Sequence, residues 1–332
     1  MGNLSDMQPP EGLNAFLNEH GWNGAIVTPV AGDASFRRYF RASRKDGRHA
    51  IIMDAPPPHE DPRPFISIAE YLLQLGFRTP AIWGRNLERG LLLIEDFGDA
   101  RMREHLDAYP EVEEATYRQA IDTLIRLSDK PAAPLPPYDM DAYLREVRLL
   151  TQWYMPAMDL PVDQAVFDEL WSEMLLPIST QAHRQVTVLR DYHAENIMLL
   201  EDGGQGIIDF QDALVGHPAY DLVSLLQDAR RDVSADLESK MIAYYRASAK
   251  DVADFDLHYA LLGAQRNTKI IGIFTRLWKR DGKERYLSFL PRMWDYLERD
   301  LEHAGLIKLK NWFDEAIPAA VRRNMPAGAQ VQ

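Results

Sequence analysis

Short segments rich in hydrophobic residues, bounded by polar turn signals, occur in the first hundred residues, and this pattern predicts β-strands. The predicted strands are Ile26–Val30, Phe36–Arg41, Ala50–Met53 and Leu91–Ile94. One segment, Phe65–Leu75, instead repeats its apolar positions at the three- and four-residue spacing of a helix, and Gly76 follows as a helix terminator. The first part of the chain is therefore predicted to be small and rich in strands.

The pattern becomes helical after about residue 101. Helices are predicted over Glu111–Ser128, Asp141–Tyr154 and Asp163–Thr180, and again throughout the chain beyond Pro218. Three short strands interrupt them: Val186–Leu189, Ile197–Leu200 and Gly206–Ile208. We therefore expect an α+β fold with two lobes, 1–95 and 96–332, a small β-ribbon inside the second lobe, and a substrate cleft between the lobes.

Composition and charge narrow the functional classes. The 332 residues include 37 basic and 50 acidic side chains, which gives a formal net charge of −13. Such an acidic balance argues against nucleic-acid binding, although a nucleotide pocket remains compatible when a divalent cation supplies positive charge. The absence of cysteine excludes disulfides, thiolate zinc sites and a cysteine nucleophile, and a cytoplasmic location is expected. No apolar run approaches membrane-spanning length, so no membrane association is expected.

The segment around the short strands carries the candidate chemistry. Asp191 is followed five residues later by Asn196, and a strand, a glycine turn and a second strand then lead to Asp209. Phosphoryl transfer needs a carboxylate that accepts the proton of the attacking hydroxyl, together with oxygen ligands for Mg²⁺. We therefore predict that Asp191 is the base and that Asn196 and Asp209 bind the metal. Aspartate and asparagine are common in loops, but this complete combination rarely arises by chance.

These residues belong to longer strings that resemble a known family. The strings are Gly32–Arg41, Met53–Pro57, Arg190–His193 and Ile208–Ala213. From about Ala25 to about Leu301 the chain resembles the aminoglycoside phosphotransferase/choline kinase family, and most closely its bacterial anomeric sugar kinases. The resemblance implies a protein-kinase-like bilobal fold, with ATP and Mg²⁺ as cofactors. It also implies phosphorylation of the C1 hydroxyl of N-acetylmuramate or N-acetylglucosamine in peptidoglycan recycling.

The resemblance also indicates where a nucleotide would bind. Gly32 and Ser35 lie in the turn that would meet the phosphates, whereas Glu95 and Phe97 lie in the hinge whose backbone groups would bind adenine. The strand lysine that normally holds the phosphates corresponds to Met53 here. We expect Arg38 to contact phosphate instead.

Two neighbours of Arg38 are alternatives for the phosphate contact. Strand alternation places Arg37 and Arg41 on the face opposite Arg38, and a solvated basic strand is the simpler interpretation of all three. Glu70, on the predicted helix, is either the partner of such an arginine or a surface charge.

Candidates for the acceptor site are polar residues near the catalytic segment. A hydroxyl-rich sugar needs paired donors and acceptors, and the carboxylate of N-acetylmuramate favours a cation. The candidates are His193, Glu195, Asp212 and Arg230. Each is equally well explained as a satisfied polar residue near the cleft. Asp221 is expected to anchor the catalytic loop. A basic cluster is expected to form a solvated helix face: Arg266, Lys269, Arg276, Lys279 and Arg280.

Two other functions compete with the sugar kinase. One is a kinase of the same family that acts on an aminoglycoside, choline or a related alcohol, which would favour an acidic or aromatic acceptor pocket. The other is a nucleotide-binding pseudokinase scaffold, suggested by the methionine at the lysine position. The retained base and metal set argues against a scaffold. The expected partners are ATP and a small amino sugar, and the protein is expected to be a monomer.

Overall fold

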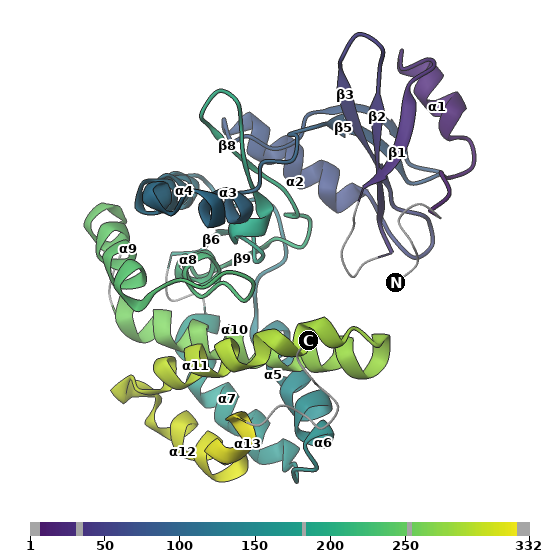
Figure 1. Ribbon diagram of the computed structural model, residues 1–332. Coiled ribbons are helices and arrows are strands. Elements are labelled where there is room, and N and C mark those ends of the chain that lie inside the picture. The colour runs from purple at the N-terminus through teal and green to yellow at the C-terminus, as the bar shows by residue number, and fades with distance from the viewer. Residues whose placement is uncertain (1–6, 31–35, 181–183, 251–253, 324–332) are drawn as a thin grey trace. The chain divides into compact units, whose positions relative to one another are not determined.

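The computed structural model describes residues 7–30, 36–180, 184–250 and 254–323. The chain forms two compact units, shown in Figure 1. The first unit is Met1–His105 with Asn196–Asp212, and the second is Leu106–Glu195 with Ala213–Gln332. The predicted α+β fold is confirmed, with strands concentrated in the first unit and helices in the second. The functional division into 1–95 and 96–332 stays a prediction.

The first unit contains a five-stranded antiparallel sheet in the order β1-β2-β3-β5-β4. The strands are β1 (Ile26–Val30), β2 (Arg38–Ser43), β3 (His49–Asp54), β4 (Ile82–Asn86) and β5 (Leu91–Glu95). The four predicted strands are confirmed within a few residues. Strand β4 was not predicted, and its pairing with β5 shifts between Ile82 and Gly84, where a glycine interrupts the alternation.

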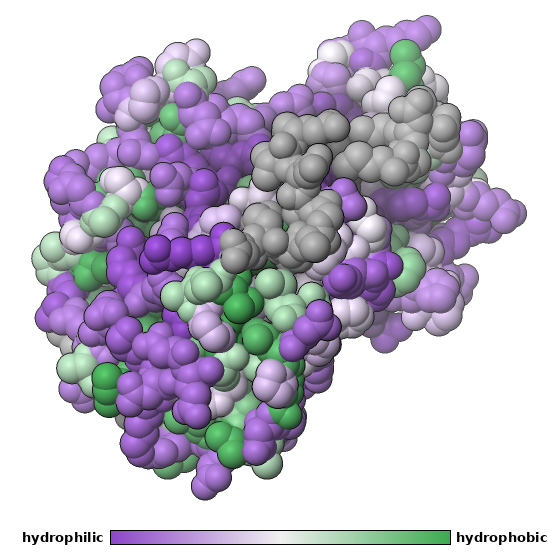
Figure 2. All heavy atoms as spheres, turned by 60° about the horizontal axis from the view of Figure 1, so that its bottom comes forward, coloured by the Kyte–Doolittle hydropathy of each residue, from purple (hydrophilic) through white to green (hydrophobic). Residues whose placement is uncertain are grey.

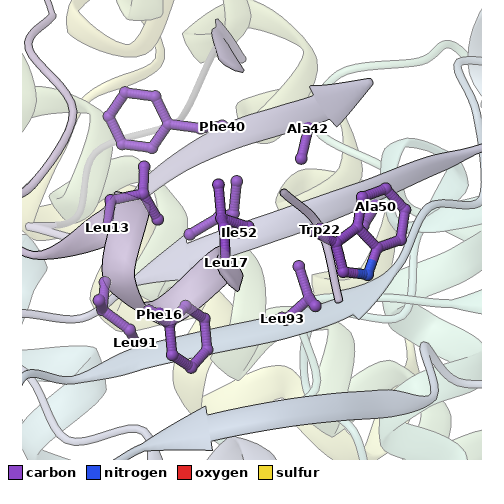
Figure 3. Close-up of a cluster of buried hydrophobic side chains, with 10 residues drawn as sticks. All are labelled: Leu13, Phe16, Leu17, Trp22, Phe40, Ala42, Ala50, Ile52, Leu91 and Leu93. Carbon is purple, nitrogen blue, oxygen red and sulfur yellow. The ribbon is translucent and has the colours of Figure 1, made fainter. Parts of the chain in front are cut away.

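Helix α1 (Leu13–Glu19) covers one face of this sheet. Figure 3 shows Leu13 of α1 beside Phe40 of the sheet and Leu17 of α1 beside Ile52, within one cluster of buried side chains. Phe40 and Ala42 are two residues apart in β2, so both face α1. Burying a leucine or phenylalanine side chain contributes about 1.5–3 kcal/mol, and this core fixes the inner strands. The helix predicted over Phe65–Leu75 is confirmed as α2 (Arg63–Gln74).

The predicted β-ribbon is confirmed as β7 (Ile197–Leu199) and β8 (Gln205–Ile207). Gly203 in its turn has φ of 79°, a left-handed conformation that glycine adopts without strain. The Leu199 N–H donates to the Ala100 carbonyl over 2.7 Å, and the Ile207 N–H donates to the Arg78 carbonyl over 2.8 Å. Both partners lie in the first unit, so hydrogen bonds fix the ribbon within that unit.

The second unit is mainly helical. Its longer helices are α4 (Glu113–Ser128), α5 (Met140–Leu149), α7 (Gln164–Ser179), α8 (Ala219–Leu226), α9 (Ala235–Ser248), α10 (Phe255–Asp281), α11 (Leu290–Leu301) and α12 (Ile307–Ala316). Shorter ones are α3 (Met102–Ala108), at the unit boundary, α6 (Met155–Ala157) and α13 (Ala319–Arg323). Strand β6 (Val186–Val188), which was predicted, pairs with β9 (Leu214–Gly216), which was not.

The helix predicted over Asp141–Tyr154 is divided. Helix α5 ends at Leu149, and a π-helical turn continues from Leu150 to Tyr154. Gly272 of α10 lies against this point, and a Cβ atom at Gly272 would stand 2.3 Å from the carbonyl carbon of Leu149. The glycine therefore permits α5 and α10 to approach more closely than any other residue would allow.

Substitution Gly272→Ala is expected to destabilise the protein by about 1–3 kcal/mol, since overpacking forces the two helices apart. Helix propensity alone would favour alanine by about 1 kcal/mol, so the sign of the change separates the two effects. Urea unfolding of both proteins measures it. A variant as stable as the parent, or more stable, would show that the close approach has no energetic importance.

The molecular face in Figure 2 is dominated by hydrophilic side chains with hydrophobic ones scattered among them. This distribution is ordinary for a protein surface. Among the helices in the described ranges, none combines the length and the apolar character that crossing a bilayer requires.

Candidate active site

The two predicted metal ligands lie side by side. Asn196 ends the short 3₁₀ helix Ala194–Asn196 and precedes β7, whereas Asp209 follows β8. Antiparallel pairing of the ribbon brings these ends together: the Ile208 N–H donates to the Asn196 carbonyl over 3.0 Å, and Asn196 Nδ2 donates to Asp209 Oδ2 over 3.3 Å. An exposed carboxylate beside an amide oxygen suits a hard cation such as Mg²⁺. These oxygen ligands fit the Mg²⁺ ion that was predicted from the sequence.

The backbone of Asp209 is held in an uncommon conformation. Its φ is 59°, in the left-handed region that aspartate and asparagine tolerate better than most residues. Gln211 Nε2 donates to Asp209 Oδ1 over 2.8 Å and so orients the carboxylate. Sequence reasoning missed this role of Gln211, because only its spacing of two residues from Asp209 signals it.

The loop that carries Asp191 is anchored in the second unit by α8. Asp221 of α8 accepts the N–H groups of Leu189 (2.6 Å) and Arg190 (2.8 Å), and Ser224 Oγ donates to the Arg190 carbonyl over 3.1 Å. These contacts hold Arg190 at φ of 70°, which is strained for arginine. Burial raises the pKa of Asp221 to about 7, against the lowering effect of the two N–H groups.

Asp191 lies beside a cluster of positive charge. Burial opposes ionisation of its carboxyl group, but the charges of Lys269 and Arg190 outweigh it, so the pKa of Asp191 is lowered. Lys269 Nζ also lies 3.0 Å from Glu146 Oε1, and Arg190 pairs with the same carboxylate. Asp191 is therefore an anion at neutral pH, ready to orient a hydroxyl and accept its proton.

The prediction that the basic cluster is a solvated face is wrong for two of its members. Arg266 is buried and donates to the Gln227 carbonyl, and the side chain of Lys269 is only 11% exposed. Both project into the unit because α10 passes through its middle and buries most of its surface. Lys279 and Arg280, near the end of the helix, are exposed as predicted.

Three of the four predicted acceptor residues form one hydrogen-bonded group. Arg230 Nη1 lies 3.1 Å from His193 Nε2, and Arg230 Nε lies 3.0 Å from Glu195 Oε2. Burial lowers the pKa of His193 to about 4, so its ring is neutral at pH 7. Nε2 then accepts from Arg230, and the proton resides on Nδ1. The fourth residue, Asp212, is exposed and belongs to the first unit.

Stability is expected to depend on His193 under mildly acidic conditions. Between its ordinary pKa of 6.5 and about 4, the unfolded chain binds a proton that the folded protein does not. The free energy of unfolding therefore falls as pH decreases through this window, by about 3 kcal/mol in total. Urea unfolding at about pH 7 and about pH 5 should show a smaller decrease for His193→Gln than for the parent. Equal decreases would contradict the buried neutral imidazole.

The predicted nucleotide residues are only partly described. Gly32 and Ser35 lie outside the described residues. The carboxylate of Glu95 accepts from the Ala81 N–H over 3.2 Å and pairs with Arg78 over 3.3 Å. Phe97 packs against Gly206 of β8, where a Cβ atom would stand 2.5 Å from its ring. These side chains therefore have structural partners, and adenine binding by the backbone around them stays a prediction.

Both arginines of β2 are held in ion pairs. Arg38 Nε donates to Asp54 Oδ2 over 2.8 Å on the face that packs against α1. Arg41 bridges Asp96 and Asp99, with contacts of 2.6 and 2.8 Å. Glu70, the other residue considered as a partner of these arginines, lies 3.4 Å from Arg85 at an exposed position.

A strand-rich unit with an antiparallel sheet and a helical unit are the architecture of a protein-kinase-like phosphotransferase. Solved structures share this fold. A choline/ethanolamine kinase family protein from Mesorhizobium loti has a TM-score of 0.64 at 12% identity, covering 90% of this chain and 95% of that one. An ADP-bound aminoglycoside phosphotransferase has a TM-score of 0.60 at 14% identity, covering 88% and 97%.

The chain belongs to the Phosphotransferase enzyme family, which matches residues 26–256. Curated relatives cover nearly the whole chain. An N-acetylmuramate/N-acetylglucosamine kinase of Caulobacter vibrioides is 33% identical and covers 93% of this chain and 97% of its own length. The protein of the same name from Pseudomonas aeruginosa is 37% identical, with coverage of 89% and 93%. The protein is therefore an enzyme, and membership of a kinase family implies the use of ATP.

Proposed function

We propose that this protein is an ATP- and Mg²⁺-dependent kinase that phosphorylates the anomeric hydroxyl of N-acetylmuramate and N-acetylglucosamine. The observation that carries the proposal is the set of four curated relatives named N-acetylmuramate/N-acetylglucosamine kinase, at 33–37% identity over 82–93% of the chain. We place the enzyme in the cytoplasm, as a monomer that acts in peptidoglycan recycling on small molecules rather than on nucleic acids or membranes.

The residues have separate roles in this proposal. Asp191 orients the C1 hydroxyl and takes its proton as the oxygen bonds to the γ-phosphorus. The bond from that phosphorus to the bridging oxygen breaks, and ADP leaves with the electron pair. Asn196 and Asp209 would hold Mg²⁺, which would supply positive charge to neutralise the phosphates. An anomeric hydroxyl is more acidic than other sugar hydroxyls, so a carboxylate base with a low pKa suffices.

The proposed acceptor site uses the group that Arg230 links. Neutral His193 offers a donor at Nδ1, Glu195 offers an acceptor, and Arg230 offers a cation for the carboxylate of N-acetylmuramate. Asp212 would either contact water bound to the metal or contact the sugar. The backbone around Glu95 and Phe97 would bind adenine, with Gly32 and Ser35 at the phosphates.

An acceptor panel tests the proposal. ADP release is measured with N-acetylmuramate, N-acetylglucosamine, choline and kanamycin, and with the methyl glycoside of N-acetylglucosamine as the matched control. We expect turnover of the two free amino sugars and none of the glycoside, since its C1 oxygen is blocked. Turnover of choline or kanamycin alone would favour another kinase of the family. ADP binding without turnover of any acceptor would favour the scaffold.

A further inference from the structure

Met53 of β3 occupies the position where the family resemblance leads one to expect a phosphate-binding lysine. Its side chain is apolar and fully buried, so it cannot supply that positive charge. Three arginines at or near β2 are the nearest candidates for that charge. Arg38 pairs with buried Asp54 and lies over the ring of Phe40, on the α1 face of the sheet. Arg41 is held by two aspartates at the end of β5, and these contacts raise its pKa further. Neither guanidinium adjoins the metal-ligand pair.

Arg37 has different surroundings. Its Nε lies 3.5 Å from Glu60 Oε2, and the two side chains are only 13% and 19% exposed. The preceding residue, Phe36, stacks on His59 with 5.4 Å between ring centroids. Two successive residues before β2 therefore contact two successive residues of the loop before α2. This double contact fixes the position of the Arg37 guanidinium.

Two observations relate Arg37 to the proposed metal site. Tyr39 pairs with Met53 across β2 and β3, so its side chain lies on the Met53 face of the sheet. Burial raises the pKa of Tyr39 to about 12, and the charges of Arg37, Asp209 and Glu60 all act on this one hydroxyl. In addition, Phe65 of α2 stacks on Phe210, the neighbour of Asp209, at 4.9 Å.

We propose that Arg37, oriented by Glu60, is the cation that binds the nucleotide's phosphates in this enzyme, in place of a lysine on β3. The proposal rests on the proposed function, since it requires a nucleoside triphosphate at Asp209. Triphosphate oxygens need a positive side chain besides the metal. Of the three arginines, Arg37 is the one that shares an electrostatic neighbour, Tyr39, with Asp209. Its planar guanidinium can bind phosphate bidentately.

Calorimetric titration of the full-length protein with ADP and Mg²⁺ tests the role of Arg37 without any acceptor. Arg37→Met should weaken ADP binding by roughly 10- to 100-fold, the value of a hydrogen bond to a charged group. Adenosine has no phosphate, so its affinity should not change, which also shows that the variant is folded. Arg37→Lys should retain part of the affinity for ADP. Glu60→Gln should weaken ADP binding less than Arg37→Met does.

Two further variants make the test specific. Arg48→Met removes a charge from the exposed β2–β3 hairpin and should leave ADP affinity unchanged. Arg38→Met should also bind ADP as the parent does. Normal ADP binding by Arg37→Met, or a loss confined to Arg38→Met, would overturn the inference and leave the acceptor proposal intact. A parent protein that binds no ADP would overturn both.

Discussion

Asp191→Asn is expected to lower kcat by roughly 10²–10⁴-fold, the usual contribution of a positioned general base. The substitution preserves the shape of the side chain but removes the anion that the surrounding cations stabilise. The loop itself should persist, because Asp221 and Ser224 bind the backbone of residues 189 and 190 rather than the Asp191 side chain. KM for ATP should therefore change little.

Steady-state ADP release from N-acetylglucosamine measures this effect. Asp202→Asn is the matched control, since Asp202 is an exposed aspartate in the turn between β7 and β8. A reduction of less than about tenfold for Asp191→Asn would show that another group accepts the proton.

Asp209→Asn is expected to lower kcat/KM for ATP by on the order of 10²–10⁴-fold, because a bound metal supplies several kcal/mol of charge stabilisation. Asparagine is the appropriate replacement, since it tolerates the left-handed backbone that Asp209 adopts at φ of 59°. The loss should then reflect the missing charge rather than a rearranged loop.

The Mg²⁺ dependence of the rate identifies the cause of this loss. Asp209→Asn should require more Mg²⁺ than the parent to reach half of its maximal rate, and Gln211→Leu should show a weaker change in the same direction, because Gln211 only orients the carboxylate. An unchanged Mg²⁺ requirement in Asp209→Asn would contradict its assignment as a ligand.

The sequence predicted those elements that are marked by a pattern within a few neighbouring residues. The ribbon is one case, since Asp202-Gly203-Gly204 lies between two apolar segments and Gly203 adopts the positive φ that the turn needs. The proximity of Asn196 and Asp209 follows from that hairpin alone. Strand β4 was missed because a glycine at its bulge interrupts the alternation, and β9 was missed as well.

Interactions between residues that lie far apart along the chain could not be predicted from the sequence. Lys269 pairs with Glu146 from another helix, and nothing in the spacing along α10 indicates that this face is buried. The partner of Arg37 was equally hidden, since Glu60 lies in a proline-rich loop rather than on the predicted helix. Charge pairs of this kind depend on how elements pack, which local patterns do not contain.

Phosphorus NMR of the reaction product tests the central claim most directly. The enzyme is incubated with ATP, Mg²⁺ and N-acetylmuramate, and the attachment of the new phosphate is determined from its coupling to sugar protons. The account predicts a sugar 1-phosphate, with the phosphorus coupled to the anomeric proton. A phosphate ester on any other oxygen, or ATP consumption without a phosphorylated sugar, would contradict it.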